Sequence, residues 1–204
     1  MEILDSIIAD YKQLKTCEEI AKDVYTPCYI LSRLPLGRYF PIDLALAKNP
    51  NTSSESLDKL FEKCKFFLYE ERIEIVCSIV RHEHTCSGTL SNIIKEYKKE
   101  SSILCKVASH PNLSCEDVKK LIKMNNQMIS EVIAQRNDLD SETIYFLFEH
   151  GDFKVLYYLG INQKCPIDVL EKIVERFIKN EWHMFDMIAL SNKLKLRKGE
   201  YRYE

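Results

Sequence analysis

Large apolar residues recur along this chain at intervals of about 26 residues, and a small residue follows each of them. The large positions are Ile20, Leu46, Ile79, Val107, Ile133 and Leu159. The small positions that follow are Ala21, Ala47, Val80, Ala108, Ala134 and Gly160. Because a small side chain lets a neighbouring helix come close, each pair predicts a packed helix. The step from Leu46 to Ile79 is longer than the others, which indicates inserted residues.

A second apolar stripe follows each pair after a polar turn. Its members are Leu31, Leu57, Leu90, Val118, Ile144 and Leu170, with Leu34, Leu60, Ile93, Leu121, Leu147 and Ile173 three residues later. The spacing of three residues is that of a helix face. The turn Lys48-Asn49-Pro50-Asn51-Thr52 carries helix-breaking residues, and Thr52-Ser53-Ser54-Glu55 predicts a helix start with Thr52 as its cap. The repeating unit is therefore a short helix, a tight turn and a longer helix.

Two short amphipathic helices cannot bury their apolar stripes alone, so neighbouring units must stack. We therefore expect an all-α solenoid of about six helix-turn-helix repeats without β-sheet. Residues 16–192 form the repeats in this interpretation, residues 1–15 form an N-terminal capping helix, and residues 193–204 form a basic, flexible C-terminal tail.

The run from Leu44 to Leu60, with its Asn49-Pro50-Asn51-Thr52 turn, resembles the variant leucine-rich repeat family. Residues 107–114 and 132–139 look like degenerate copies of the same repeat. The resemblance implies a right-handed superhelix of alternating α and 3₁₀ helices, related in architecture to HEAT-like repeats. Some members of the family carry a cysteine-rich iron-sulfur segment. No closely spaced cysteine run precedes these repeats, so we expect no cofactor.

Composition narrows the class of protein. Hydrophobic residues make up 46% of the chain, which favours a folded domain over a disordered one. The 29 basic and 31 acidic residues leave a formal charge of −2, so no overall field favours nucleic acid or an anionic membrane. The chain has no signal-peptide pattern, no apolar run of membrane-spanning length and no C-x-x-C pair among its eight cysteines. We expect a soluble, cytoplasmic protein with reduced thiols.

The most reactive string is His82-Glu83-His84-Thr85-Cys86, since His82, His84 and Cys86 are three zinc-ligand types within five positions. Cys86 beside either histidine, or Cys105 near His110, would also suit nucleophilic catalysis. Against both hypotheses, His82 falls at the polar turn position that Asn49, His110 and other polar residues share. We therefore predict neither a metal site nor an enzyme.

A polar edge runs along the predicted turns and is the expected interaction surface. Its residues are Lys48, Asn49, Arg81, His82, His110 and Arg136. The favoured function is a scaffold that binds another protein, in an oligomeric state that the sequence leaves open. A nucleic-acid-binding solenoid that uses the basic positions Lys22, Lys48 and Arg81, together with Arg136, is the first alternative, and a small metal-binding protein is the second. The apolar stretch of residues 66–69 is expected to pack between repeats, although exposure would mark a binding surface.

Overall fold

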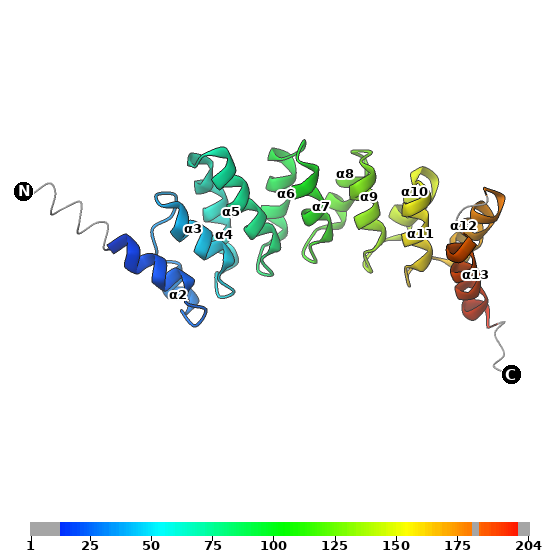
Figure 1. Ribbon diagram of the computed structural model, residues 1–204, viewed down its shortest axis with the longest axis horizontal. Coiled ribbons are helices and arrows are strands. Elements are labelled where there is room, and N and C mark those ends of the chain that lie inside the picture. The colour runs from blue at the N-terminus through cyan, green and yellow to red at the C-terminus, as the bar shows by residue number, and fades with distance from the viewer. Residues whose placement is uncertain (1–12, 181–183, 200–204) are drawn as a thin grey trace, which may run out of the picture. The chain divides into compact units, whose positions relative to one another are not determined.

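The computed structural model describes residues 13–180 and 184–199 of the chain (Figure 1). All regular secondary structure in these ranges is helical and none of it is strand, which confirms the predicted all-α class. The chain divides between Leu113 and Ser114 into two compact units, which are described separately below.

The first unit begins with a helix that the structure describes over residues 13–22. The elements that follow are α2 (Cys28–Leu31), α3 (Phe40–Lys48), α4 (Ser54–Lys63), the 3₁₀ helix η1 (Cys64–Phe66), α5 (Tyr69–Arg81), α6 (Ser87–Glu96) and α7 (Ser101–Ser109). The lengthened helix α5 and the short helix η1 hold the residues that extend the repeat between Leu46 and Ile79.

The second unit consists of α8 (Cys115–Ile122), α9 (Gln127–Ala134), α10 (Ser141–His150), α11 (Phe153–Ile161), α12 (Ile167–Lys179) and α13 (Met184–Lys198). In both units the A helices are the helix of residues 13–22, α3, α5, α7, α9, α11 and α13, and the B helices are α2, α4, α6, α8, α10 and α12. Each A helix up to α11 leads through a polar turn into a B helix. Within a unit, each A helix lies beside the next A helix along the chain, as α9, α11 and α13 do in Figure 1.

The apolar columns of the sequence form the core. Leu46, Ile79, Val107, Ile133 and Leu159 are all buried, and so are the small residues that follow them. The need for a small residue is clearest at Gly160, where an added Cβ atom would lie 2.6 Å from Cδ2 of Leu190 on α13. The small column is therefore required because adjacent A helices approach closely.

Helix starts follow the capping chemistry of the sequence, with one correction. Ser114 and Asp140 cap α8 and α10 by accepting the backbone N–H bonds of Asp117 and Thr143. At α4 we predicted Thr52 as the cap, but Ser53 takes this role and accepts from the N–H of Ser56. The hydroxyl of Thr52 instead donates to the carbonyl oxygen of Leu46 at 2.7 Å and ties the turn to its own A helix.

The predicted ends of the repeat region differ from the observed elements. The N-terminal capping helix falls mainly on residues 1–12, outside the described residues, and its last residues belong to a helix that continues to residue 22. Helix α2 ends at Leu31, well before Pro35, which disfavours helix around Leu34. We predicted a flexible tail from residue 193, but residues 193–198 are helical and continue α13.

Candidate protein-binding surface

The polar residue that follows an A helix holds two successive turns together. Asn49 donates from Nδ2 to the carbonyl oxygens of Ala21 at 2.8 Å and Asp23 at 2.9 Å, both in the preceding turn. Its Oδ1 accepts the N–H of Asn51 at 3.0 Å and so closes its own turn. A single buried amide therefore satisfies three backbone groups.

Histidines link successive turns in the same way at the next two turns. His82 bonds through Nε2 to the carbonyl oxygen of Asn49 at 2.8 Å, while its Nδ1 accepts the N–H of His84 at 3.1 Å. His110 bonds through Nε2 to the carbonyl oxygen of His82 and accepts the N–H of Asn112 at Nδ1, both at 3.1 Å. We assign the proton of each ring to Nε2, because Nδ1 faces a backbone donor.

The second unit repeats the arrangement. Asn162 donates from Nδ2 to the carbonyl oxygens of Ala134 and Arg136 and accepts the N–H of Lys164. Arg136 forms a two-pronged ion pair with Asp138, which holds the pKa of the Asp138 carboxyl below its usual range. We call the series Asn49, His82, His110, Arg136 and Asn162 the turn ladder.

The turn ladder corrects the predicted interaction surface. Asn49, His82, His110 and Arg136 are only 3% to 9% exposed. The first three side chains reach inward to backbone groups, and Arg136 pairs with the carboxylate of Asp138. They are not surface residues, and the prediction is wrong for these four. Lys48 and Arg81 are exposed, as predicted. Sequence alone misses the distinction because asparagine, histidine and arginine are as common at exposed turns as at buried ones.

The hypothetical zinc ligands do not meet at one point. Both ring nitrogens of His82 are engaged by the backbone, and Nδ1 of His84 bonds to the carbonyl oxygen of Thr52 at 3.0 Å. The sulfur of Cys86 instead lies 3.6 Å from a carboxylate oxygen of Asp58 on α4. Within residues 13–180 and 184–199, no cluster of three His, Cys, Asp or Glu side chains has the geometry to hold a metal ion.

The basic edge of the first unit is largely neutralised. Lys22 forms an ion pair with Glu18, one turn earlier on the same helix. Lys48 pairs with Glu74 of α5 at 3.2 Å. Arg81 is exposed at the same position of the following A helix. Acidic partners thus sit beside two of the three bases that would have to bind phosphate.

The outer side of α11 exposes apolar side chains that the sequence analysis did not predict to be at the surface. The exposed Lys154 is the one charged residue of this helix, so α11 is apolar on nearly all sides. Its inner side is buried, but Tyr157 and Tyr158 are half-buried and Ile161 is 43% exposed. A helix that is apolar all round is normally covered on every side.

The neighbouring A helices also carry exposed or half-buried apolar side chains. Helix α9 contributes Met128, which is 59% exposed, and the half-buried Val132. Helix α13 contributes the exposed Ile188, at the repeat position that Tyr157 holds on α11. We call these side chains the α11 face: Met128, Val132, Tyr157, Tyr158, Ile161 and Ile188. At the position of Ile161 the preceding A helices carry Lys22, Lys48, Arg81, Ser109 and Gln135, so an apolar residue at this position is a feature of α11.

The first unit has a smaller apolar feature on its own A helices. A groove of about 280 Å³ lies between the helix of residues 13–22 and α3. Phe40, Pro41 and Leu44 form its apolar part, and Lys22 and Lys48 stand at its polar end. Its size suits one or two side chains of a partner rather than a whole small-molecule ligand.

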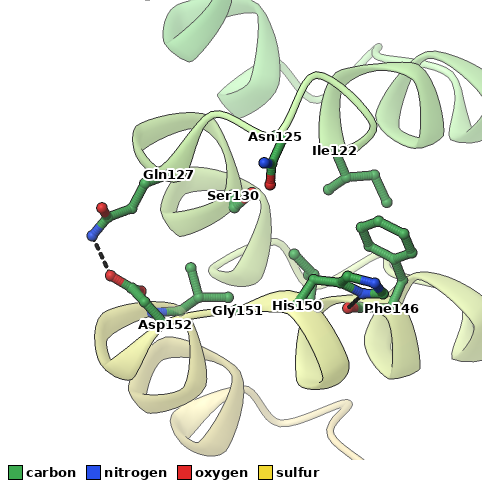
Figure 2. A pocket seen from close by; sticks show the side chains of 10 residues that line it. Ile122, Asn125, Gln127, Ser130, Phe146, His150, Gly151 and Asp152 are labelled. Atoms are coloured by element: carbon green, nitrogen blue, oxygen red, sulfur yellow. Dashed lines mark hydrogen bonds between the residues drawn. The ribbon is translucent and has the colours of Figure 1, made fainter.

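A pocket of about 110 Å³ lies among α8, α9, α10 and α11 (Figure 2). At its rim Gln127 donates to the carboxylate of Asp152, the residue that caps α11. Nδ1 of His150 lies 3.1 Å from the carbonyl oxygen of Phe146, and the imidazole stacks on the Phe146 ring at 4.3 Å. The histidine is therefore fixed by its own helix, which is the arrangement of a packed joint rather than of a catalytic base.

The apolar stretch after η1 does not pack between repeats as we expected. Phe66 is 79% exposed and Leu68 is also exposed, whereas Phe67 packs edge-on against Phe40. These residues lie where η1 ends at Phe66 and the chain turns into α5, which begins at Tyr69. These residues add an exposed apolar segment to the first unit.

In the described part of the chain, every helix is too short or too polar to cross a lipid bilayer. Comparison of the chain with protein-family models, with curated proteins and with solved structures found no match.

Proposed function

We propose that this protein is a non-enzymatic scaffold of the variant leucine-rich repeat type, a right-handed α-solenoid that binds another protein through the α11 face. The observation that carries the proposal is the composition of α11, whose outer side leaves tyrosine and isoleucine in contact with water. Exposed aromatic and aliphatic side chains gathered on one face are typical of protein-binding surfaces.

The solenoid part of the proposal rests on the repeat geometry. Asn49 and Asn162 make equivalent bonds in the two units. Asn49 bonds to the carbonyl oxygens of Ala21 and Asp23, and Asn162 bonds to those of Ala134 and Arg136. Neighbouring A helices are thereby spaced by an equivalent set of bonds within each unit, which is how stacked repeats are built.

Among binding partners, a protein is favoured over nucleic acid. Apolar side chains supply affinity for protein surfaces, whereas binding to phosphate requires free basic groups. Glu18 and Glu74 neutralise two of the three basic edge residues. An electrophoretic mobility shift at low salt that disappears at physiological salt would favour the nucleic-acid alternative.

The chain offers a matched pair of variants for testing the surface. Ile161→Lys places a charge on the α11 face, and Ile178→Lys places one on α12, where Ile178 is 56% exposed. Affinity capture from the native cell, read out by mass spectrometry, should recover a protein with wild type and Ile178→Lys but not with Ile161→Lys. Equal recovery with both variants would contradict the proposed surface, provided circular dichroism shows both to be folded.

A further inference from the structure

Asn49 and His82 of the turn ladder link successive turns through equivalent hydrogen bonds, but their side chains differ in chemistry. Asn49 and His82 each donate to a carbonyl oxygen of the preceding turn and each accept a backbone N–H two residues later in their own turn. The asparagine amide does not titrate, whereas the histidine ring does so near neutral pH. The joint that His82 makes therefore depends on a protonation state, and the joint that Asn49 makes does not.

The geometry admits only the neutral ring. Nε2 must carry a proton to donate to the carbonyl oxygen of Asn49 at 2.8 Å. Nδ1 must be unprotonated to accept the N–H of His84 at 3.1 Å. Protonation would set an N–H of the ring against the N–H of His84, so the bond that closes the turn would be replaced by repulsion.

The surroundings of His82 also disfavour a positive charge. The side chain is 7% exposed. From its own turn it faces Glu83 and His84, whose ring centre is 5.3 Å away, and from the following turn it faces His110. The preceding turn presents the carbonyl oxygen of Asn49. Burial is the largest influence and lowers the pKa of His82. Smaller contributions come from the hydrogen bond to Asn49 and the carboxylate of Glu83, which raise it, and from His84 and His110, which lower it.

We propose that His82 is an acid-sensitive joint between the turn of residues 49–53 and the turn of residues 82–86. Above neutral pH its ring holds the two turns together. In mild acid it takes up a proton, loses the N–H of His84 and loosens this joint, while the asparagine joints at positions 49 and 162 stay closed. The device is independent of the partner that the protein binds.

The direction of the stability change follows from linkage. The unfolded chain binds a proton at His82 below the ordinary histidine value of about 6.5, whereas the folded chain binds it only at lower pH. The stabilisation is therefore fully present above about pH 6.5 and is lost as the pH falls through the folded pKa.

Asn49 and Asn162 occupy the position of His82 in other turns and make equivalent bonds there, so asparagine is the matched replacement for His82. His82→Asn should fold and should remove the part of the acid sensitivity that His82 contributes, while His110 keeps its own joint. Between pH 7.5 and pH 5, the unfolding equilibrium constant of wild type should rise about threefold to tenfold relative to that of His82→Asn, measured by urea denaturation. His150→Asn, which replaces an exposed histidine of α10, should keep the pH dependence of wild type.

A second measurement is independent of the variants. Nitrogen chemical shifts of the His82 ring in the wild-type protein should show the Nε2–H tautomer at pH 7.5 and a protonation midpoint below the ordinary histidine value of about 6.5. Identical pH dependence of His82→Asn and wild type would overturn the proposal. So would a His82 ring that carries its proton on Nδ1 at neutral pH.

Discussion

The amine of Lys193 lies 2.8 Å from the carbonyl oxygen of Asn162 and 2.8 Å from that of Gly160. Asn162 itself bonds to the equivalent pair in the preceding turn, the carbonyl oxygens of Ala134 and Arg136. Lys193 on α13 therefore bonds to α11 and its turn as Asn162 bonds to α9 and its turn, although α13 continues past Lys193 without a turn. Burial lowers the pKa of the Lys193 amine, as expected for a charge that lies inside the fold.

Lys193→Ala should destabilise the protein by about 1–2 kcal/mol, because two carbonyl oxygens at the end of α11 and its turn lose their donor. Urea denaturation measures this loss, and amide hydrogen exchange should show faster opening of α13. Lys195→Ala, at an exposed position of the same helix, is the control. Equal stability of the two variants would show that the two bonds from Lys193 do not stabilise the fold.

The buried carboxyl group of Asp43 gives a pH-dependent prediction. Its side chain is fully buried on α3, with Oδ2 accepting the N–H of Gly37 at 2.7 Å and Oδ1 lacking a hydrogen-bond partner among the described residues. Burial raises the pKa of Asp43 to about 6, although the bond from Gly37 opposes the shift. The folded chain therefore binds the proton more readily than the unfolded chain, and stability falls as the pH rises from about 4 to about 6.

Asp43→Asn removes the buried charge and retains an oxygen that can accept from Gly37. It should stabilise the protein by about 1–3 kcal/mol at pH 7.5 and should give little gain at pH 4, where the native carboxyl group is already neutral. Denaturation at the two pH values measures the difference. A gain of equal size at both would mean that Asp43 is not charged in the folded protein at neutral pH. Asp23→Asn, on an exposed residue, should change little at either.

The small-residue column gives a packing prediction. Ala134 is fully buried at the end of α9, in the position that Gly160 holds on α11. Ala134→Leu should destabilise by about 1–3 kcal/mol through overpacking. Ala189→Leu, at an exposed alanine of α13, adds the same atoms on the surface and should be nearly neutral. If thermal denaturation shows no loss for Ala134→Leu, the repeat register is wrong.

The buried positions of the apolar columns could be predicted from the sequence, because burial selects apolar residues at regular helical spacing. Leu57, Leu90 and Leu170 are buried where the spacing predicts them. The ladder could not be read in the same way. Asn49 and His82 share a column, but only the three-dimensional turn shows that both point inward to backbone carbonyls rather than outward to solvent.

The proposed binding surface could not be predicted from the sequence because its residues suit a buried helix as well. Tyr157, Tyr158 and Ile161 belong to an apolar run that suits a buried helix equally well. Exposure depends on whether a neighbour covers the outer side of α11, and this is settled by packing between helices distant in sequence. One sequence signal was available: Ile161 is the apolar member of a column whose other members are basic or polar, namely Lys22, Lys48, Arg81, Ser109 and Gln135.

The most direct test of the central claim is site-specific photo-crosslinking on the α11 face. A photoreactive phenylalanine analogue replaces Tyr157 on α11 or, as the matched control, Tyr145 on α10, which is 40% exposed. After irradiation in the native cell, we expect a covalent adduct with another protein from position 157 and none from position 145. An adduct with twice the mass of the chain would identify a second copy as the partner. Crosslinking from position 145 with none from position 157 would contradict the claim that the α11 face is the binding surface.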